Sequence, residues 1–582
     1  MIRLLLKEVK EYKAASIATP LCMIWEVAME MCIPFLMASI IDDGVTKGDM
    51  GHIYKVGGLM IVIAILGLIA GLLGGRFAAK ASTGFAKNIR EKVFNHIQTF
   101  SFANIDKFST AGLVTRLTTD ITNIQMSYQV LLRMFTRSPV TLICAMAMAF
   151  YIDARIASIY LVAVIFLGVV VISIMKRAMK YFQQAFPKYD ELNAAVQENV
   201  SAIRVVKAYV REEEETSKFK KASQNIYKIF VQAEKNTIYN GPIMQVTVYS
   251  CILLISWLGA KMIVSDTLTT GELMSLLAYC MNILMSLMMM SMMFVMASMS
   301  LASIKRVGEV LQETSDITNP EEPIYEVPNG SVEFRHVNFA YRKDSEEPVL
   351  KDINLQINSG ETIGVMGATG SAKTSLVNLI SRLYDVTEGE VLVGGQNVKA
   401  YDLKSLRNQV SVVLQNNVLF AGTILENLRW GKEDATQEEC EKACRQACAD
   451  EFIKRFPDGY NTHIEQGGTN VSGGQKQRLC IARALLKQPK ILILDDSTSA
   501  VDTATDAKIR KAFGEEIPDT TKFIISQRVS SLQHADRIIV MDDGQVHGFG
   551  THEELLENNE IYREIYETQT KGGGDFDERV GD

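Results

Sequence analysis

The stretch that decides the fold is Gly367-Ala368-Thr369-Gly370-Ser371-Ala372-Lys373-Thr374, between an apolar run (362–366) and a run with helical periodicity (375–383). A strand, a glycine-rich turn and a helix in this order point backbone N–H groups inward at the helix N-terminus, where the helix dipole favours anions. Lys373 is placed to reach the outer phosphates of a nucleotide, and Thr374 to hold Mg²⁺. The pattern has glycine before the lysine, whereas this chain has Ala372, whose methyl group is expected to crowd the phosphates.

The composition bounds the class of protein. At 582 residues the chain is too long for one core, because a domain takes about 150 residues. The apolar content is 48%, and the long uncharged runs are all in the first half. The net charge of −7 argues against a nucleic acid as a partner.

The nine cysteines form no C-x-x-C pair. Cys440, Cys444 and Cys448 recur every four residues, so they are expected along one face of a helix. We interpret them as a buried or half-buried stripe of reduced thiols. A metal site is the alternative, but no histidine lies close to them in the sequence.

Six apolar segments have about the 20 residues that the core of a lipid bilayer requires. Lysines and arginines gather before the first segment, between the second and third, and after the fourth, so the N-terminus and these connections are expected in the cytosol. No cleavable signal is evident, and membrane lipid is the expected surrounding. The six segments are residues 16–40, 56–79, 131–152, 156–176, 242–265 and 271–299.

The two long cytosolic connections are helix-patterned throughout. The simplest prediction is that the second to fifth membrane helices continue well beyond the membrane. Each connection is then expected to turn at a short piece, Ser101–Phe108 in the first and about 200–212 in the second. Such pieces can dock on a cytosolic domain and carry force.

Two carboxylates lie inside the first apolar segment. Glu26 and Glu30 are one helical turn apart on one face, and a carboxylate in the bilayer core costs roughly 2.5–3.5 kcal/mol on insertion scales. They indicate either a water-filled cavity that accepts cationic cargo or takes part in a proton-linked step, or structural pairing with a polar group on another span.

The sixth segment is rich in methionine. Met is unbranched and polarizable, so it can line an adaptable binding surface. Met285 and Met289 are candidates for contact with an apolar substrate, and packing between helices or contact with lipid is the alternative.

Residues 312–329 contain three prolines and no sustained apolar periodicity, which marks a linker between a membrane domain (1–311) and a soluble domain (330–569). The soluble part alternates strand-like and helix-like runs. Residues 570–582 combine three glycines with acidic residues and are expected to be a disordered tail.

Further motifs occur in a fixed order before and after the nucleotide loop. Tyr341 precedes the loop, and Gln415 follows a strand-like run. The fragments after these are Val471-Ser472-Gly473-Gly474-Gln475 at the start of a helical run, the buried strand 491–495 that ends in Asp495, Ser499-Ala500-Val501-Asp502, and Gln527 after the run 523–526.

In this order the fragments resemble an ABC exporter half-transporter, and the resemblance covers essentially the whole chain except the tail. It implies a multi-domain protein: an all-α six-span membrane domain (type I exporter, or type IV ABC fold) followed by an α/β P-loop nucleotide-binding domain. The fused half-size architecture favours a bacterial inner membrane, with the nucleotide-binding domain in the cytosol.

The resemblance also implies ATP and Mg²⁺ as cofactors and gives each motif a role. Tyr341 is expected to stack on adenine. The phosphate loop is Gly367, Gly370, Ser371, Ala372, Lys373, Thr374 and Ser375. The Mg²⁺ ligands are Thr374, Gln415 and Asp495, while Ser472, Gly473, Gly474 and Gln475 are expected to contact the γ-phosphate of a nucleotide bound to a different subunit.

Two catalytic positions depart from the family pattern. Asp496 stands where the family has the glutamate that positions the attacking water, and Gln527 stands where it has histidine. The shorter Asp496 withdraws its carboxylate by one C–C bond, although a base must come within about 2.6–3.2 Å of its proton or act through one water. Gln527 can donate a hydrogen bond but cannot become cationic. With Ala372, three departures surround one phosphate, which predicts a site that binds ATP and hydrolyses it slowly.

The signature fragment at Ser472 is intact. Because two domains of this family meet head to tail, the asymmetry predicts a heterodimer with a second, different half-transporter. The expected cargo is a small hydrophobic or amphipathic molecule. Glu26, Glu30 and the methionines favour an amphipathic cation, while lipids and peptides stay open. Two alternatives stay open at this point: an ATP-binding regulatory subunit that transports nothing, and an exporter-shaped importer.

Overall fold

The computed structural model describes residues 1–582 except 343–344, 346, 498–500 and 572–582. The chain divides into two compact units. The helical unit is Met1–Gln98 with Ser109–Glu313. The α/β unit is Thr99–Phe108 with the chain from Thr314 onward, so a short piece between two membrane helices belongs to the soluble unit.

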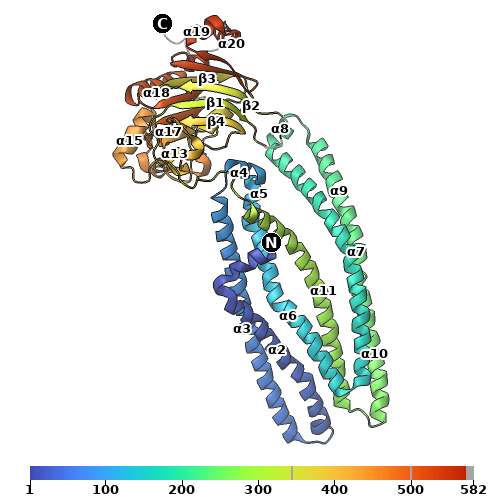
Figure 1. The fold of residues 1–582 in the computed structure, drawn as a ribbon. Coiled ribbons are helices and arrows are strands. Elements are labelled where there is room, and N and C mark those ends of the chain that lie inside the picture. The colour runs from blue at the N-terminus through green and yellow to red at the C-terminus, as the bar shows by residue number, and fades with distance from the viewer. Residues whose placement is uncertain (343–344, 346, 498–500, 572–582) are drawn as a thin grey trace. The chain divides into compact units, whose positions relative to one another are not determined.

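The helical unit is built of long helices (Figure 1). Short segments alternate with them: α1 (Ile2–Leu6), η1 (Lys7–Tyr12), η2 (Ile40–Val45), α5 (Thr110–Thr115), η3 (Arg116–Asp120) and α8 (Ile203–Ala208). The long helices are α2 (Lys13–Ser39), α3 (Met50–Ile97), α6 (Ile121–Ile152), α7 (Ala154–Ser201), α9 (Glu212–Thr237), α10 (Asn240–Val264) and α11 (Thr270–Gln312).

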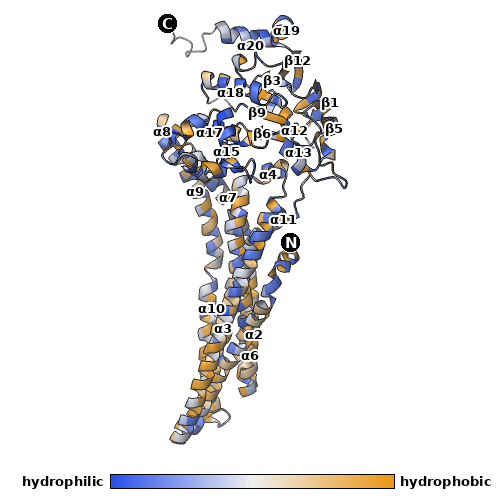
Figure 2. Ribbon diagram, turned by 90° about the vertical axis from the view of Figure 1, so that its left-hand side faces the viewer, coloured by the Kyte–Doolittle hydropathy of each residue, from blue (hydrophilic) through white to orange (hydrophobic). Residues whose placement is uncertain are grey.

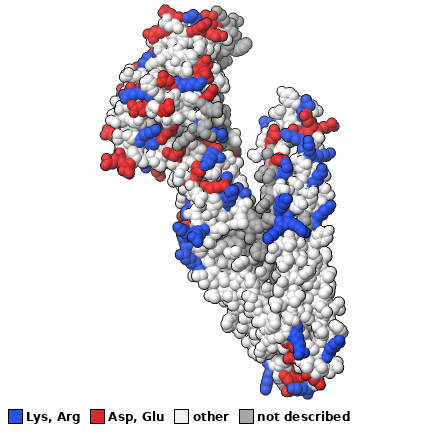
Figure 3. All heavy atoms as spheres, turned by 45° about the vertical axis from the view of Figure 1, so that its right-hand side comes forward, with Lys and Arg blue, Asp and Glu red and all other residues white. Residues whose placement is uncertain are grey.

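Among the described residues, six helical segments are long and apolar enough to cross a membrane, and each contains one of the six expected spans in whole or in large part. Hydrophobic residues dominate α2, α3, α6 and α10 in Figure 2. On the face drawn in Figure 3, charged side chains gather near the ends of the helices and leave a largely uncharged band between. The chain is therefore an integral membrane protein.

The long helices pack on one another, and α7 and α10 contact α11 as well as each other. Helix α2 packs on α3 and α6, α11 packs on α6 and α2, and α7 pairs with α9 and α10. Both ends of α11 are held by aspartates. Asp42 accepts hydrogen bonds from Thr269 Oγ1 (2.6 Å) and Gly271 N (2.9 Å), and the buried Asp120 accepts from Ser303 Oγ (2.8 Å) and from Arg306.

Both turning pieces are confirmed, and the helical extensions are confirmed for the second and fourth spans. The third span lies in α6, which begins at Ile121, and the fifth lies in α10, which is separate from the cytosolic helix α9. Helices α3 and α7 each run for 48 residues, more than twice the bilayer requirement. The chain turns at α4 (Phe102–Phe108), inside the expected piece 101–108, and at α8, inside the expected piece 200–212.

Two larger sheets and a short strand pair organise the α/β unit. The six-stranded sheet has the order β12-β11-β3-β10-β9-β6 and is parallel except for β12, while the four-stranded sheet β2-β1-β4-β5 is antiparallel. The strands are β1 (Val332–Phe339), β2 (Leu350–Ile357), β3 (Thr362–Gly367), β4 (Glu388–Val393), β5 (Gln396–Asn397), β6 (Val410–Val413), β7 (Gly422–Thr423), β8 (His463–Ile464), β9 (Ile491–Asp495), β10 (Thr521–Ile525), β11 (Arg537–Asp542) and β12 (Gln545–Gly550).

Helices cover this framework and complete its core. Buried side chains of the four-stranded sheet and of α12 pack on one face of the six-stranded sheet, and those of α15 and α17 pack on the other. The helices are α12 (Lys373–Ile380), α13 (Leu403–Gln409), α14 (Ile424–Arg429), α15 (Gln437–Gln446), α16 (Asp450–Ile453), α17 (Gly473–Leu485), α18 (Thr503–Glu516), α19 (His552–Asn558) and α20 (Glu560–Lys571).

Parallel register brings the functional segments to one edge of the six-stranded sheet. Ile525 of β10 is paired with Val365 of β3 on one side and with Asp495 of β9 on the other. The chain leaves all three strands at the same end. Ligands of open parallel sheets bind outside these carboxyl ends.

The cysteine stripe is a packing feature. Cys440 and Cys444 are fully buried on α15 in the core shared with α17, and burial raises the pKa of the Cys444 thiol to about 12. Cys448 lies just beyond the helix end, with a left-handed backbone (φ 51°), so it is not on the same helix face.

The linker is ordered against the α/β unit. Ile324 forms a bridge with Tyr401, and Asn319 donates to Asp402 (2.6 Å). At the other end, α20 runs to Lys571, so Thr570 and Lys571 are helical rather than part of the expected tail. The remaining tail, 572–582, lies outside the described residues.

Candidate functional site

The phosphate loop joins β3 to α12, as its spacing predicts. Gly367 has φ 155°, and a Cβ atom there would lie 2.2 Å from Met541 O and 2.6 Å from Ser371 Oγ, so only glycine fits. Gly370 has φ 92° and open space around it, so glycine is needed there for its backbone conformation alone.

Ala372 occupies a left-handed conformation (φ 71°, ψ 21°) directly before α12. That conformation costs an alanine roughly 1–2 kcal/mol and a glycine almost nothing. The loop therefore keeps the path that glycine would take, and it carries strain and a methyl group at the edge of the site.

The Lys373 ammonium is folded back onto its own loop. Its Nζ donates to Gly367 O (2.9 Å), Ala368 O (2.8 Å) and Ser371 Oγ (3.3 Å). Burial lowers the pKa of Lys373, and the neighbouring carboxylates oppose that shift. A phosphate would replace these neutral oxygen partners with an anionic one, so that both the donor and the acceptor carry charge.

Thr374 and Asp495 meet at the head of α12. Thr374 Oγ1 donates to both Asp495 oxygens, at 3.1 and 2.9 Å. Burial raises the pKa of the Asp495 carboxyl, and the adjacent Asp496 raises it further, against the Thr374 hydrogen bond and Lys373. A cation bound here would favour the charged carboxylate that burial disfavours.

Asp496 follows β9 in a left-handed conformation, with φ 46°. Its backbone N–H donates to Ile525 O (3.1 Å), and its carboxylate is hydrogen-bonded by the Gln415 side chain. Burial raises the pKa of Asp496, whereas Gln415, Lys373 and Arg528 lower it. The short acid is therefore held by Gln415 within the site.

Gln527 follows β10 by two residues, and its backbone is clamped from α20. Gln569 Nε2 donates to Gln527 O (2.7 Å), and Gln569 Oε1 accepts from Val529 N (2.9 Å). Sequence reasoning missed Gln569, because a glutamine on a polar amphipathic helix carries no local signal of a long-range contact.

One cavity of about 300 Å³ collects most of these residues. It is the site that the parallel register predicts. Its lining from the predicted set is Gly370, Ala372, Lys373, Thr374, Ser375, Gln415, Asp495, Asp496 and Gln527, together with Thr369 and the unpredicted Val349 and Ile525.

Tyr341 lies beside the cavity rather than in its lining. Its hydroxyl is 2.7 Å from Ser375 Oγ, and its ring packs edge-on against Phe339 and Tyr384. The side chain is 45% exposed, so one ring face is open to solvent. Stacking on adenine stays a prediction.

Ser472 caps α17 away from this cavity. Its hydroxyl accepts from Gln475 N (3.3 Å), while Gln475 Oε1 accepts from Ser472 N (2.9 Å), a reciprocal capping box. Ser472 and Gly473 are exposed, and neither they nor Gly474 and Gln475 line the cavity. The capped helix N-terminus is open to a ligand from outside this chain.

The donor set suits Mg²⁺ and phosphate. Hydroxyl, carboxylate and amide oxygens are hard ligands, and Thr374, Asp495 and Gln415 bring them to one cavity. Lys373 and the N-terminus of α12 supply positive charge for phosphates. The residues present therefore fit a Mg²⁺–nucleotide.

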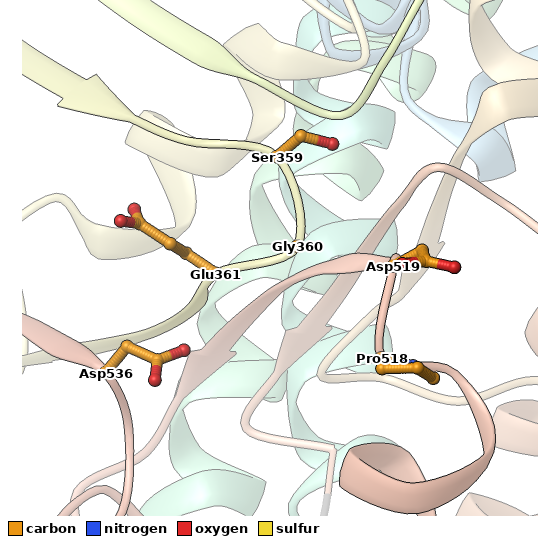
Figure 4. Close-up of a pocket in the computed structure, with 6 residues that line it drawn as sticks. All are labelled: Ser359, Gly360, Glu361, Pro518, Asp519 and Asp536. Carbon is orange, nitrogen blue, oxygen red and sulfur yellow. The ribbon is translucent and has the colours of Figure 1, made fainter.

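A second hollow lies at the opposite end of the same sheet, between the turn before β3 and the turn before β10 (Figure 4). Its carboxylates hold turns: Asp536 Oδ2 accepts from Thr362 N (2.7 Å), and Glu361 accepts from Asn358 and Arg537. It is at the amino ends of the strands, where parallel sheets do not place ligands.

In the helical unit, the carboxylates of α2 are paired. Arg137 of α6 donates to Glu26 Oε1 (2.8 Å) through Nη1 and to Glu30 Oε2 (3.0 Å) through Nη2. All three line a cavity of about 460 Å³ between α2, α3 and α6. The candidate Met285 and Met289 are exposed on α11 and do not line it.

Comparison with protein families supports the same division of the chain. The family model described as ABC transporter transmembrane region matches residues 17–288, and the one described as ABC transporter matches residues 350–499.

Relatives match over nearly the whole length. The chain is 35% identical over 560 residues to an uncharacterized ABC transporter ATP-binding protein of Bacillus subtilis, covering 96% of this chain and 97% of the relative. It is 33% identical over 582 residues to a putative multidrug export ATP-binding/permease protein of Staphylococcus aureus, covering 98% and 100%. A bacterial Atm1-family ABC exporter solved with ATP bound has the same fold, with a TM-score of 0.83 at 22% identity over 96% and 99% of the chains.

Proposed function

Since this chain belongs to the ABC transporters, with the membrane region and the ATP-binding domain in one polypeptide, we propose that it exports amphipathic molecules as one half of a heterodimer. The observation that carries the proposal is the single cavity formed by Lys373, Thr374 and Asp495 in a chain with six membrane-crossing helices. The name of the S. aureus relative supports export as the direction.

Each residue of the cavity has a task in ATP hydrolysis. Lys373 binds the outer phosphates, Thr374 and Asp495 hold Mg²⁺, and Gln415 orients Asp496. Bound Mg²⁺ neutralises charge that develops on the phosphates. Asp496 positions the attacking water from one C–C bond further back than a glutamate, so water activation is the step expected to be slow.

The asymmetry of the motifs supports a different partner. Asp496 and Gln527 line this chain's own cavity, whereas Ser472 caps an exposed helix outside it. We infer that Ser472 completes a site whose glutamate and histidine lie on a second half-transporter. This chain's own site then holds ATP longer and keeps the two nucleotide-binding domains engaged between cycles.

The α/β unit contains the part that links ATP to the membrane. Helix α4 is joined directly to α3 in the chain, and its Asp106 accepts a hydrogen bond from Tyr384 (2.9 Å). Tyr384 contacts Tyr341, which is hydrogen-bonded to Ser375 on the first turn of α12. Nucleotide-driven movement of α12 can therefore reach α4 through two tyrosines.

The cationic cargo expected from Glu26 and Glu30 rested on unpaired carboxylates, but the structure pairs both with Arg137. The amphipathic class is retained, because the cavity also has an apolar wall. The inner membrane of a bacterium, with the nucleotide-binding domain in the cytosol, remains our proposed location.

The test is ATP-driven accumulation of a fluorescent amphiphile in inside-out vesicles that contain this chain with a candidate partner half-transporter. We expect uptake that needs both chains and hydrolysable ATP, and that Ser472→Ala abolishes. Uptake that is unchanged in Ser472→Ala, or that this chain supports alone at the full rate, would contradict the heterodimer.

A further inference from the structure

The cavity between α2, α3 and α6 holds four charged side chains at one level of the helices. Glu26 and Glu30 come from one face of α2, and Arg133 and Arg137 from one face of α6, each pair four residues apart. Charged side chains within membrane helices are costly and mark substrate pathways more often than structural positions. Two of each sign make the cavity neutral overall.

The four charges are not fully satisfied by one another. Arg137 bonds to both carboxylates. In the part of the chain that the structure describes, the buried Nε of Arg133 and the buried Oε2 of Glu26 have no hydrogen-bond partner. A buried group of this kind costs about 1–3 kcal/mol, more when it is charged, so a ligand whose polar groups displace the neighbouring side chains and pair with these two atoms would recover that cost.

The rest of the cavity is apolar and open. Ile63, Leu68 and Leu72 of α3 line it, and Leu68 and Leu72 are more than 60% exposed. Gly71 lies against the Glu26 carboxylate, because a Cβ atom there would be 3.2 Å from it. The charged groups thus face an apolar strip along α3, which suits a molecule with one polar end.

Resting on the proposed export function, we propose that this cavity binds amphiphiles with a zwitterionic head group. The acidic group of the ligand contacts Arg133, its cationic nitrogen contacts Glu26 Oε2, and its alkyl chain lies along α3. A cation alone would face Arg133 and Arg137 without compensation, and an anion alone would face the two carboxylates. Only a head group with both charges pairs with both orphaned atoms.

The test is equilibrium binding, without ATP, of three probes with the same twelve-carbon chain to the full-length protein in amphipol. They are dodecylphosphocholine, dodecyltrimethylammonium and dodecyl phosphate, each below its micellar concentration. We expect the zwitterion to bind about tenfold more tightly than either of the others. Its phosphate accepts a charge-assisted hydrogen bond from Arg133, which the cationic probe cannot do. Its quaternary nitrogen, which has no N–H, pairs with the Glu26 carboxylate by charge alone, and the anionic probe lacks that pairing. Equal binding, or tighter binding of the cation, would overturn the proposal.

Variants locate the site. Arg133→Gln is expected to weaken phosphocholine binding about tenfold and Arg133→Lys to restore part of it. The matched control is Arg76→Gln, an exposed arginine of α3 outside the cavity, which should bind as the wild type does. Wild-type binding by Arg133→Gln would refute the assignment. If that variant does not fold, the probe preference of the wild type and Arg133→Lys still decide.

Two further measurements separate the sources of the ligand and the two proposals. If phosphatidylethanolamine added to the amphipol sample displaces dodecylphosphocholine, the occupant is a membrane lipid; if it does not, the occupant is a free amphiphile. Both outcomes agree with a zwitterionic head group. ATP-driven uptake without probe preference would overturn this inference and leave export standing. Selective binding without ATP-driven uptake would do the reverse.

Discussion

At the scale of single residues, the nucleotide site keeps the residues that bind phosphate and Mg²⁺ in the family pattern and departs from that pattern at Ala372, Asp496 and Gln527. Lys373, Thr374 and Asp495, the residues that would hold a Mg²⁺–nucleotide, line one cavity. Ala372 keeps the path of a glycine at the cost of strain, and Asp496 is held by Gln415. Binding and hydrolysis are thus expected to respond separately to substitution.

Ala372→Gly is expected to tighten ATP binding several-fold, because it removes the methyl group from the cavity and relieves the left-handed strain. Its effect on the free energy of unfolding should be small, because glycine also raises the conformational entropy of the unfolded chain, which offsets the relieved strain. Titration with a fluorescent ATP analogue measures the affinity. Gly370→Ala is the matched control: it adds strain where the structure has open space, and should lower the free energy of unfolding by about 1 kcal/mol. Unchanged affinity in Ala372→Gly would show that the methyl group does not matter.

Asp495→Asn is expected to stabilise the nucleotide-free protein at pH 7, raising its Tm by about 2–4 °C. The pKa of Asp495 is raised by burial, so its charged form opposes folding, and the wild type gains stability as the pH falls through that raised pKa. The gain of the variant should therefore shrink as the pH falls through the raised pKa of Asp495. With Mg²⁺ and ATP the order should reverse, because only the wild type holds the metal.

The control for this pH dependence is Asp402→Asn. Asp402 is a half-buried helix cap whose pKa is lowered by the Ser405 N–H, so its asparagine variant should gain no stability at pH 7. Thermal unfolding of the detergent-solubilised protein measures both. A gain in Asp495→Asn that does not decrease as the pH is lowered would rule out titration of this carboxyl as its source.

At the scale of elements, two helices far from the phosphate loop in sequence are attached to the nucleotide site. Helix α20 holds the backbone around Gln527, and α4 contacts Tyr384. Each attachment depends on one side chain. A single substitution can therefore remove either attachment without changing a residue that lines the cavity.

Gln569→Ala is expected to lower kcat for ATP about threefold to tenfold with little change in KM, because the loop that carries Gln527 loses the two hydrogen bonds that its backbone makes to Gln569 while the phosphate loop is untouched. Steady-state ATPase measurements with the partner present give both constants. Thr570→Val, on the same helix, removes only a bond within α20 to Tyr566 O and should leave both constants unchanged. A rise in KM at constant kcat would contradict a role in positioning Gln527.

Tyr384→Phe is expected to leave basal ATPase within about twofold of the wild type and to lower ATP-driven uptake about threefold to tenfold. The ring contacts remain, while the hydrogen bond to the Asp106 carboxylate, worth about 1.5–3 kcal/mol, is lost. The matched control is Tyr401→Phe, which also removes a hydroxyl bond, to Val393 O, but away from α4. It should alter stability and not coupling. Equal loss of uptake in both variants would remove the case for a specific path through Tyr384.

At the scale of the whole molecule, the sequence predicts what depends on local spacing and leaves hidden what depends on long-range contact. Helix periodicity and apolar length predict the six spans, and the glycine and lysine spacing predicts the loop at the end of β3. The partner of Glu26 and Glu30 could not be assigned, because Arg137 lies more than 100 positions away. The sequence also could not predict the contact made by Gln569 or the place of α4 in the α/β unit, because both follow from packing between distant segments.

The altered nucleotide site was likewise only partly predictable from the sequence. Substitutions at 372, 496 and 527 are visible in the sequence, and the structure shows that all three line one cavity while Ser472 does not. Together, the three altered side chains are expected to slow ATP hydrolysis at this chain's own site. We propose that this chain retains ATP and that its partner hydrolyses it.

The most direct measurement is the rate of ATP hydrolysis by this chain purified without a partner, compared with its Asp496→Glu, Gln527→His variant. The account predicts that the wild type binds ATP and hydrolyses it slowly, and that the double variant is at least about tenfold faster, because a positioned base contributes about 10²–10⁴-fold. Lys373→Ala in the same double variant should lose the gained activity. A wild-type rate equal to that of the double variant would contradict the account.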